Sequence, residues 1–170
     1  MPRNSDFISE AVSPALVAAL RATYALPWCG THGAPHWLRV RENGLQLAKL
    51  TGADPVVVEL FAVIHDIKRL NEGHDHGHGP RAAVWAQTAV RALLPLDAHA
   101  LDKLAYACAT HTHGLTEAEV TVQTCWDADR LDLYRVGIMP DPARLCTKAA
   151  RSPEILRSAV DRSTMPPERR

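Results

Sequence analysis

The stretch "VVVELFAVI", residues 56–64, places apolar side chains on almost every side of a helix. A helix that is apolar all round is stable only when other elements cover it, so this stretch predicts a buried central helix. Asp54 and Pro55 precede it. This pair favours a helix start, because aspartate accepts hydrogen bonds from the first amides and proline fits the first turn. We expect the helix to continue through "HDIKRL" to Leu70.

Apolar residues recur at helical spacing along most of the chain, and alternating runs of β-branched residues are scarce. The sequence therefore predicts an all-α fold, a single compact bundle of about six to eight helices in one domain, residues 1–170. Helices are expected at residues 14–26, 35–51, 55–70, 80–94, 97–112 and 124–136, with a short helix from Thr116 and one or two packed turns at 141–150. The core is expected within residues 14–149, and the polar, proline-rich residues 163–170 are expected to fray.

The charge balance argues against several classes of partner. Lys and Arg together number 19, as do Asp and Glu, and no long basic stripe is present, so we do not expect the chain to bind a nucleic-acid duplex. No window approaches the roughly 20 apolar residues that cross a membrane, and acidic residues interrupt the N-terminal segment where a signal peptide would be apolar. The four cysteines form no CxxC pair, which favours reduced thiols. We therefore expect a cytoplasmic protein.

Side chains that can bind metal occupy positions that face the core of several expected helices. They are His36, His65, Asp66, His111 and Asp129. A single histidine on an apolar face is most often a hydrogen-bonded core residue. A buried ionised aspartate, however, is unfavourable by several kcal/mol unless a cation or hydrogen bonds compensate it. Two aspartates and three histidines in one small domain therefore predict a divalent transition metal, namely Mn, Fe, Co, Ni or Zn, because imidazole and carboxylate ligands suit these ions.

Three segments carry the pattern H…HD…D. They are "HWLRVRENGLQLA" with His36, "AVIHDIKR" with His65 and Asp66, and "CWDADRLDL" with Asp129. In this order and at these spacings, residues 36–133 resemble the HD-domain metal-dependent phosphohydrolases. The resemblance implies a helical HD-type domain. It also implies a hydrolase that uses metal-activated water to cleave a small phosphate ester, whether a phosphomonoester, a phosphodiester or a nucleotide.

Dinuclear members of that family place a third histidine at the start of the helix after the HD loop and a fourth at the end of the next helix. His78 in "HGPRAA" and His111 in "CATHTHG" match these positions, although His113 competes with His111 and would otherwise lie on the substrate side or at an exposed helix end. The resemblance implies one or two metal ions. With two ions, Asp66 would bridge them, and the remaining ligands would divide into two sets: His36, His65 and Asp129 in one, His78 and His111 in the other.

A phosphorylated substrate would also need positive charge. Arg69 occupies the place of the basic residue in the family's HD-I-G-K stretch, although Lys68 replaces its glycine. A guanidinium group can hold two phosphate oxygens at once, which makes Arg69 a candidate catalytic and substrate-binding residue. Arg81 and Arg130 are further candidates for substrate contact, with a solvated or ion-paired side chain as the alternative for each.

Three more aspartates lie beside the pattern. Asp75 in the loop "HDHGHG" is a candidate proton donor or a partner of a ligand, and a solvated loop residue is the alternative. Asp132 lies three residues after Asp129 and can reach the same side of a helix, so we expect it to orient a ligand. Asp127 points about 200° away from Asp129 and cannot address the same ion.

Two other functions remain open at this point. Some HD-domain proteins are mixed-valence diiron oxygenases that resemble myo-inositol oxygenase and use the same six ligands. Those proteins usually carry a lysine soon after the fourth histidine, whereas Thr112, His113 and Gly114 follow His111 here, which favours hydrolysis. The second alternative is a metal-stabilised domain that binds a ligand without turnover. We also expect that the chain could form a homodimer.

Overall fold

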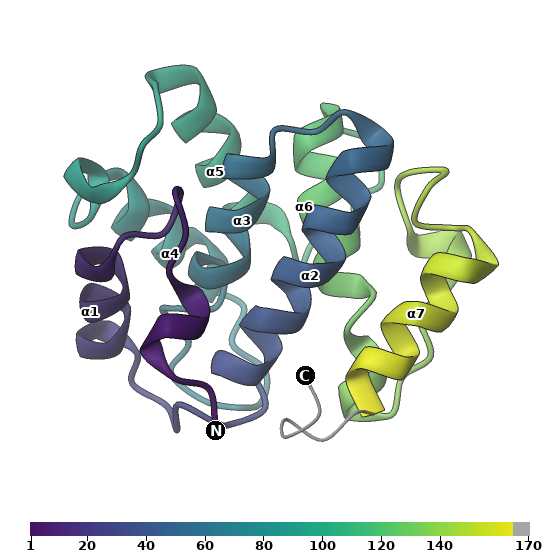
Figure 1. The fold of residues 1–170 in the computed structure, drawn as a ribbon, viewed down its shortest axis with the longest axis horizontal. Helices are drawn as coiled ribbons and strands as arrows, with labels where there is room; N and C mark the ends of the chain where they lie inside the picture. Colours follow the sequence, from purple (N-terminus) through teal and green to yellow (C-terminus); the bar gives the residue numbers. More distant parts are fainter. Residues whose placement is uncertain (165–170) are drawn as a thin grey trace.

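The computed structural model describes residues 1–164. These residues form an all-α fold without strands (Figure 1), which confirms the predicted fold class. Its α-helices are α1 (Pro14–Thr23), α2 (Ala34–Thr51), α3 (Pro55–Ile64), α4 (His78–Gln87), α5 (Ala98–Thr110), α6 (Val120–Arg130) and α7 (Pro153–Thr164). Short 3-10 helices lie between or before them: η1 (Asn4–Phe7), η2 (Arg91–Leu93), η3 (Leu133–Val136) and η4 (Pro142–Arg144).

The helix α3 lies at the centre of the bundle, where it packs against α2, α5 and α6 (Figure 1). Residues 57–64 are all buried, as the apolar stretch predicts. One of them is charged. Glu59 accepts a hydrogen bond from Arg41 Nε at 2.6 Å, so its buried carboxylate is compensated by a neighbouring helix. The central helix expected from the sequence is therefore present.

Three helix ends carry residues that favour such ends. Asp54 accepts hydrogen bonds from the amides of Val56 and Val57, at 2.9 and 3.3 Å, and so caps α3. Asp97 caps α5 in the same way. Gly52 ends α2 with φ at 76°, a left-handed conformation that glycine adopts without steric penalty.

The third helix is shorter than the sequence predicts. It ends at Ile64 instead of Leu70, because the amides of Ile67 and Arg69 bond to carbonyls three residues back, which tightens the chain into turns. The expected end at residue 26 is also wrong for α1, which stops at Thr23. The helices α4 and α6 likewise end early, at residues 87 and 130, and a 3-10 helix follows each of them.

Three expected helix starts are also wrong. The helix α6 begins at Val120, four residues before the expected start at 124. The helix α4 begins at His78, two residues before Pro80, so His78 lies in its first turn. No helix begins at Thr116. Glu119, three residues later, is the N-terminal cap of α6 and accepts a hydrogen bond from the amide of Thr121 at 3.0 Å.

The last helix, α7, was not predicted, and it extends the core beyond residue 149. Its buried residues join those of α2, the end of α6 and the following loop in a separate apolar cluster of Leu47, Leu131, Leu145, Ala150, Ile155 and Ala159. Ser163 and Thr164 belong to this helix, so the tail expected to fray from residue 163 begins helical. The rest of that tail, residues 165–170, lies outside the described residues.

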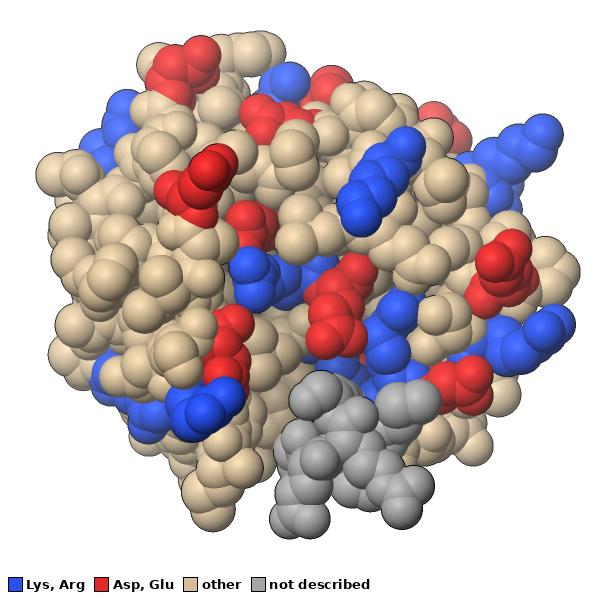
Figure 2. Space-filling view, viewed as in Figure 1, with Lys and Arg blue, Asp and Glu red and all other residues tan. Residues whose placement is uncertain are grey.

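Acidic and basic side chains are mixed over the face shown in Figure 2, without a large area of one sign. This distribution agrees with the equal numbers of acidic and basic residues in the sequence. In the described part of the chain, no helix combines the length and the apolar character that a membrane span requires.

Candidate metal centre

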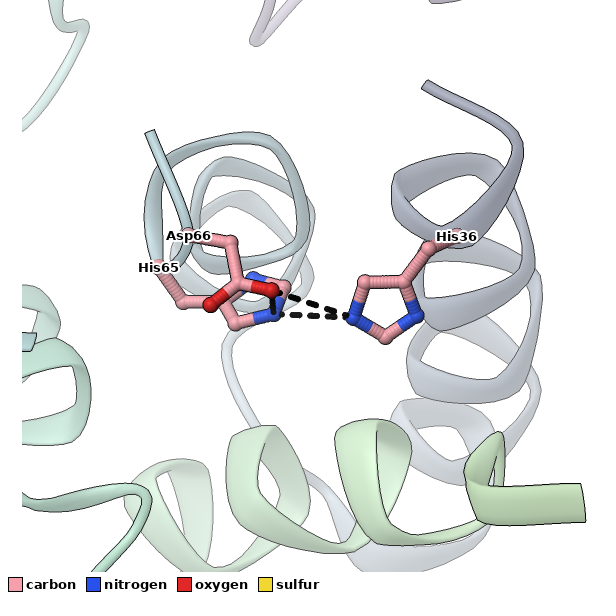
Figure 3. A group of neighbouring side chains, drawn as sticks. All are labelled: His36, His65 and Asp66. Atoms are coloured by element: carbon pink, nitrogen blue, oxygen red, sulfur yellow. Dashed lines mark hydrogen bonds and ion pairs between the residues drawn. The ribbon is translucent and has the colours of Figure 1, made fainter. Parts of the chain in front are cut away.

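His36 lies in the first turn of α2, is fully buried and points toward the end of α3 (Figure 3). Its Nδ1 donates to Asp132 Oδ2 at 2.7 Å. Its Nε2 lies 3.1 Å from His65 Nε2, 3.3 Å from Asp129 Oδ1 and 3.7 Å from Asp66 Oδ2. The helices α2, α3 and α6 thus bring the three parts of the H…HD…D pattern together.

His65 and Asp66 lie where α3 ends, and both are buried. The imidazole of His65 stacks on Phe61, one turn earlier, and its Nδ1 donates to the Phe61 carbonyl at 3.1 Å. Its Nε2 is 3.5 Å from Asp66 Oδ2 and 3.7 Å from Asp129 Oδ1. Packing and hydrogen bonding therefore fix the ring so that Nε2 faces the carboxylates.

A second pair of histidines faces the other oxygen of Asp66. His78 Nε2 lies 3.0 Å and His111 Nε2 3.8 Å from Asp66 Oδ1, and the two Nε2 atoms are 2.9 Å apart. His78 comes from the start of α4 and His111 from the end of α5. These helices approach closely at Gly79, where an added Cβ would lie 2.4 Å from the Cys108 carbonyl oxygen.

The donor set fits a divalent transition metal. The Nδ1 atoms of His65, His78 and His111 each donate to a backbone carbonyl, which can only accept. Neutral imidazoles bonded in this way turn the lone pair of Nε2 inward, as metal-binding histidines do. Lone pairs that face one another and two carboxylates repel unless a cation lies among them. Six side chains from five helices and their ends meet this condition: His36, His65, Asp66, His78, His111 and Asp129.

Burial and neighbouring charges hold the ligands in the protonation states that metal binding needs. Burial lowers the pKa of His65 to about 3 and also lowers the pKa of His111, so both rings are neutral at pH 7. Burial raises the pKa of Asp66, but the electrostatic interaction with His65 and the hydrogen-bond contact with His78 outweigh burial, so the pKa of Asp66 lies well below 3.8. The pKa of Asp129 is lowered in the same way, mainly by its hydrogen bond with His36.

His36 behaves differently. Burial and the charge of Arg135 lower its pKa, but the hydrogen bonds with Asp129 and Asp132 outweigh them, so the pKa of His36 lies above 6.5. A proton and a metal ion therefore compete for its Nε2 near neutral pH.

The structure thus brings together the six side chains expected as ligands. Of the two histidines between which the sequence left the choice open, His111 is buried in the cluster and His113 is exposed. Asp132 lies against His36, as expected. Asp127 accepts instead from the amides of Cys146 and Thr147, away from the cluster.

Arg69 is buried beside the second histidine pair. Its Nη1 lies 3.5 Å from Asp66 Oδ1 and 3.3 Å from His78 Nε2. Its Nη2 donates to the Gly73 carbonyl at 2.6 Å, so the loop after α3 holds the guanidinium in place. This is the only one of the three candidate arginines whose guanidinium contacts the cluster within residues 1–164.

The other two candidate arginines are engaged elsewhere. Arg81 Nη2 donates to both oxygens of Asp75, at 2.7 and 2.6 Å, and to the Lys68 carbonyl. Arg130 donates to the carbonyls of Leu115 and Arg144. Its position next to Asp129 in sequence does not bring it to the cluster, because consecutive residues on a helix point about 100° apart. These contacts suit roles in holding loops, not in binding a substrate.

Asp75 also fastens its loop. Besides the pair with Arg81, it accepts from the amide of Leu70 at 2.9 Å. Burial raises its pKa, but the hydrogen bond from Arg81 and that amide outweigh burial, so the pKa of Asp75 is lowered. A lowered pKa keeps the carboxylate ionised at neutral pH and does not suit the role of proton donor that the sequence suggested.

Two arginines that were not expected from the sequence as site residues donate hydrogen bonds to Asp132, the partner of His36. Arg39 Nε donates to Asp132 Oδ1 at 2.6 Å, and Arg135 Nη1 donates to the Asp132 carbonyl at 3.1 Å. Arg39 lies three residues after His36, on the same side of α2, and this spacing was the available signal.

Comparison with protein-family models and with curated proteins gave no match. Among solved structures, the chain is similar to a crystal structure described as a predicted HD superfamily hydrolase from an uncultured Thermotogales bacterium. The two share 22% sequence identity with a TM-score of 0.65, over 85% of this chain and 82% of that chain. At this identity the likeness establishes the fold alone, and the chain therefore has the helical fold of that HD superfamily hydrolase.

Proposed function

We propose that this protein is a metal-dependent phosphohydrolase of the HD type with a dinuclear centre. One observation carries the proposal: the two oxygens of the buried Asp66 carboxylate face two different histidine pairs. Oδ2 faces His36 and His65, and Oδ1 faces His78 and His111. A carboxylate in this position could contact two ions, one beside each histidine pair, whereas a single ion beside one pair would leave the other pair without a metal.

The ligands divide accordingly. His36, His65 and Asp129, whose facing atoms lie 3.1 to 3.7 Å apart, would hold one ion, and His78 and His111 would hold the other, with Asp66 facing both sets. When bound, divalent ions supply a Lewis acid that activates water at neutral pH and neutralises charge on a phosphate group.

The chain itself contributes orientation and charge. Asp132 fixes the ring of His36, and backbone carbonyls fix the other three imidazoles, so the ligands do not have to reorganise when the site is loaded. Arg69 Nη1 lies beside Asp66 and His78. In the proposed enzyme it donates to a phosphate oxygen and orients the ester, since a guanidinium stays charged at any working pH.

Exposure of the ligands favours a small substrate. The side chain of Asp129 is 20% exposed, whereas that of Asp66 is 3% exposed and those of the four histidines are no more exposed than that. The cluster therefore opens to solvent at Asp129, where a small phosphate ester can enter more readily than a folded nucleic acid.

The proposal is tested with protein purified without chelator or affinity tag and then loaded separately with Mn, Co, Fe, Ni or Zn. We expect release of phosphate from at least one member of a panel of phosphomonoesters, nucleotides and phosphodiesters. The variant Asp66→Asn should lose both turnover and metal, because it removes the shared ligand. The variant Asp141→Asn changes an aspartate whose side chain is 54% exposed and should retain both.

Two results would contradict the proposal. Consumption of oxygen by the iron-loaded protein, without phosphate release, would show the diiron oxygenase instead. Full metal loading without turnover of any ester would show a metal-stabilised binding domain.

A further inference from the structure

A pocket of about 300 Å³ includes in its lining Pro35, the residue before His36, and Arg39. None of the six candidate metal ligands lines this pocket. Its lining residues come from the loop before α2, the start of α2, η3 and the end of α7. Its lining includes Gly30, Thr31, Pro35, Arg39, Arg135 and Ser163.

Two guanidinium groups of this pocket retain free donors. Arg39 is only 8% exposed, and its Nε donates to Asp132. Arg135 donates from Nε to the Thr31 carbonyl at 3.1 Å and from Nη1 to the Asp132 carbonyl. Within residues 1–164, no acceptor pairs with Nη1 or Nη2 of Arg39, or with Nη2 of Arg135. Three terminal nitrogens on the wall of one pocket therefore have hydrogen bonds left to make.

The charge of the pocket is positive. The two arginines face a single carboxylate, that of Asp132, and its oxygens are already engaged. Oδ1 accepts from Arg39 and from the Ser163 hydroxyl at 2.9 Å, and Oδ2 accepts from His36. The remaining lining residues are uncharged. Two guanidinium groups and one carboxylate thus leave the pocket with one net positive charge, beside donors that lack acceptors.

We propose that this pocket binds a small oxyanion group, a phosphate or a carboxylate, between Arg39 and Arg135. Guanidinium nitrogens bind such groups through charge-assisted hydrogen bonds, and the bound oxygens supply the acceptors that these nitrogens lack. Because the same Asp132 holds both arginines and the ring of His36, the anion site is joined to the metal centre by one residue.

The test uses inorganic phosphate and the full chain after removal of metal by chelator, so that phosphate cannot bind through metal ions. We expect saturable binding in calorimetry, and changes in the NMR signals of the Gly30 and Thr31 amides and of the Arg39 and Arg135 Nε–H groups. The variant Arg135→Gln should weaken binding by about tenfold or more, because it removes a charged donor. The matched control Arg144→Gln changes an arginine that is 84% exposed outside the pocket and should bind phosphate as the wild type does.

Absence of saturable binding in the wild type would overturn the proposal, as would equal affinity in Arg135→Gln. If that variant does not fold, the NMR signals of the wild type decide, because binding elsewhere would leave those of Gly30 and Thr31 unchanged. This experiment needs neither metal nor turnover, so its failure is distinguishable from failure of the proposed function.

A second measurement identifies the source of the anion and rests on the proposed function. If the pocket holds a second anionic group of the substrate, Arg135→Gln raises KM more for esters that carry such a group than for esters with a neutral tail. If it holds a separate anion, the variant changes both KM values by the same factor while the phosphate affinity still falls.

Discussion

Asp132 Oδ2 lies 2.7 Å from His36 Nδ1, and this buried pair joins the end of α6 to the start of α2 across 96 residues of sequence. The carboxylate of Asp132 is fully buried, and hydrogen bonds from His36, Arg39 and Ser163 compensate the loss of water around its charge. Asp132 therefore fixes the direction in which His36 presents Nε2 to the other side chains of the candidate metal centre.

The first prediction concerns this pair. We expect Asp132→Asn to weaken metal binding by about 10- to 100-fold, because the neutral amide holds the imidazole less firmly and makes it a poorer ligand. A matched control is Asp127→Asn, in which the changed aspartate is equally buried on α6 but accepts from the amides of Cys146 and Thr147. That variant should lose stability while its metal affinity stays as in the wild type. Metal titrations and thermal unfolding of both variants check this, and equal metal affinity of Asp132→Asn and wild type would contradict it.

The second prediction concerns the number of ions. Elemental analysis of wild-type protein should find about two metal ions per chain, and His78→Ala should lower the value toward one, because the second ion loses one of its two histidines. His76→Ala is the control, since His76 is exposed in the same loop and stacks only on His74. About one ion per chain in wild type and variant alike would mean a mononuclear centre.

Five of the six side chains of the candidate metal centre were expected at core-facing positions because of helical spacing, whereas His78 was expected only from the resemblance to the HD-domain family. His36 follows the buried face of α2, and His65 with Asp66 ends a helix that is buried on all sides. A polar residue at such a position needs a reason, and several such positions together indicate a shared one.

Contacts between distant segments could not be predicted in the same way. The bonds of Asp132 to Arg39, and of Arg130 to the Leu115 carbonyl, depend on how helices and loops pack, and no local pattern records that packing. The helix α7 carries a proline at its start and apolar residues at Ile155 and Ala159, but charged residues surround them. The apolar residues of α7 pack against α2 and the loop after η4, and the local sequence of α7 does not record that surface.

The third prediction concerns pH. The pKa of His65 is about 3 in the folded metal-free protein and 6.5 when unperturbed, so below pH 6.5 the unfolded chain binds more protons than the folded one. Stability from His65 is thus complete above pH 6.5 and is lost as the pH falls toward 3, by up to about 1.4 kcal/mol per pH unit. The raised pKa of His36 acts with the opposite sign, since its contribution is lost as the pH rises through its folded value.

Urea unfolding of chelator-treated protein at several pH values between 4 and 7 measures this slope. We expect the free energy of unfolding of the wild type to rise with pH over this range, and His65→Asn to show a shallower slope. A slope that the substitution leaves unchanged would assign the pH dependence to other groups.

The last prediction concerns the approach of α4 to α5. Replacing a helical glycine by alanine normally stabilises a protein by about 1 kcal/mol. At Gly79 the added Cβ would lie 2.4 Å from the Cys108 carbonyl oxygen and 3.3 Å from His111 Cε1, so we expect Gly79→Ala to destabilise the fold by about 1–3 kcal/mol instead. The same displacement should move His78 away from His111. It should therefore weaken binding of the ion assigned to these two histidines more than binding of the ion assigned to His36, His65 and Asp129.

Unfolding midpoints and metal content of Gly79→Ala check both effects. Gly73→Ala is the control, because the nearest atom to its Cβ, Asn71 Oδ1, is at an ordinary contact distance of 3.4 Å. A stabilised Gly79→Ala that keeps both ions would mean that the two helices separate without strain, and that His78 and His111 do not depend on this close approach for their position.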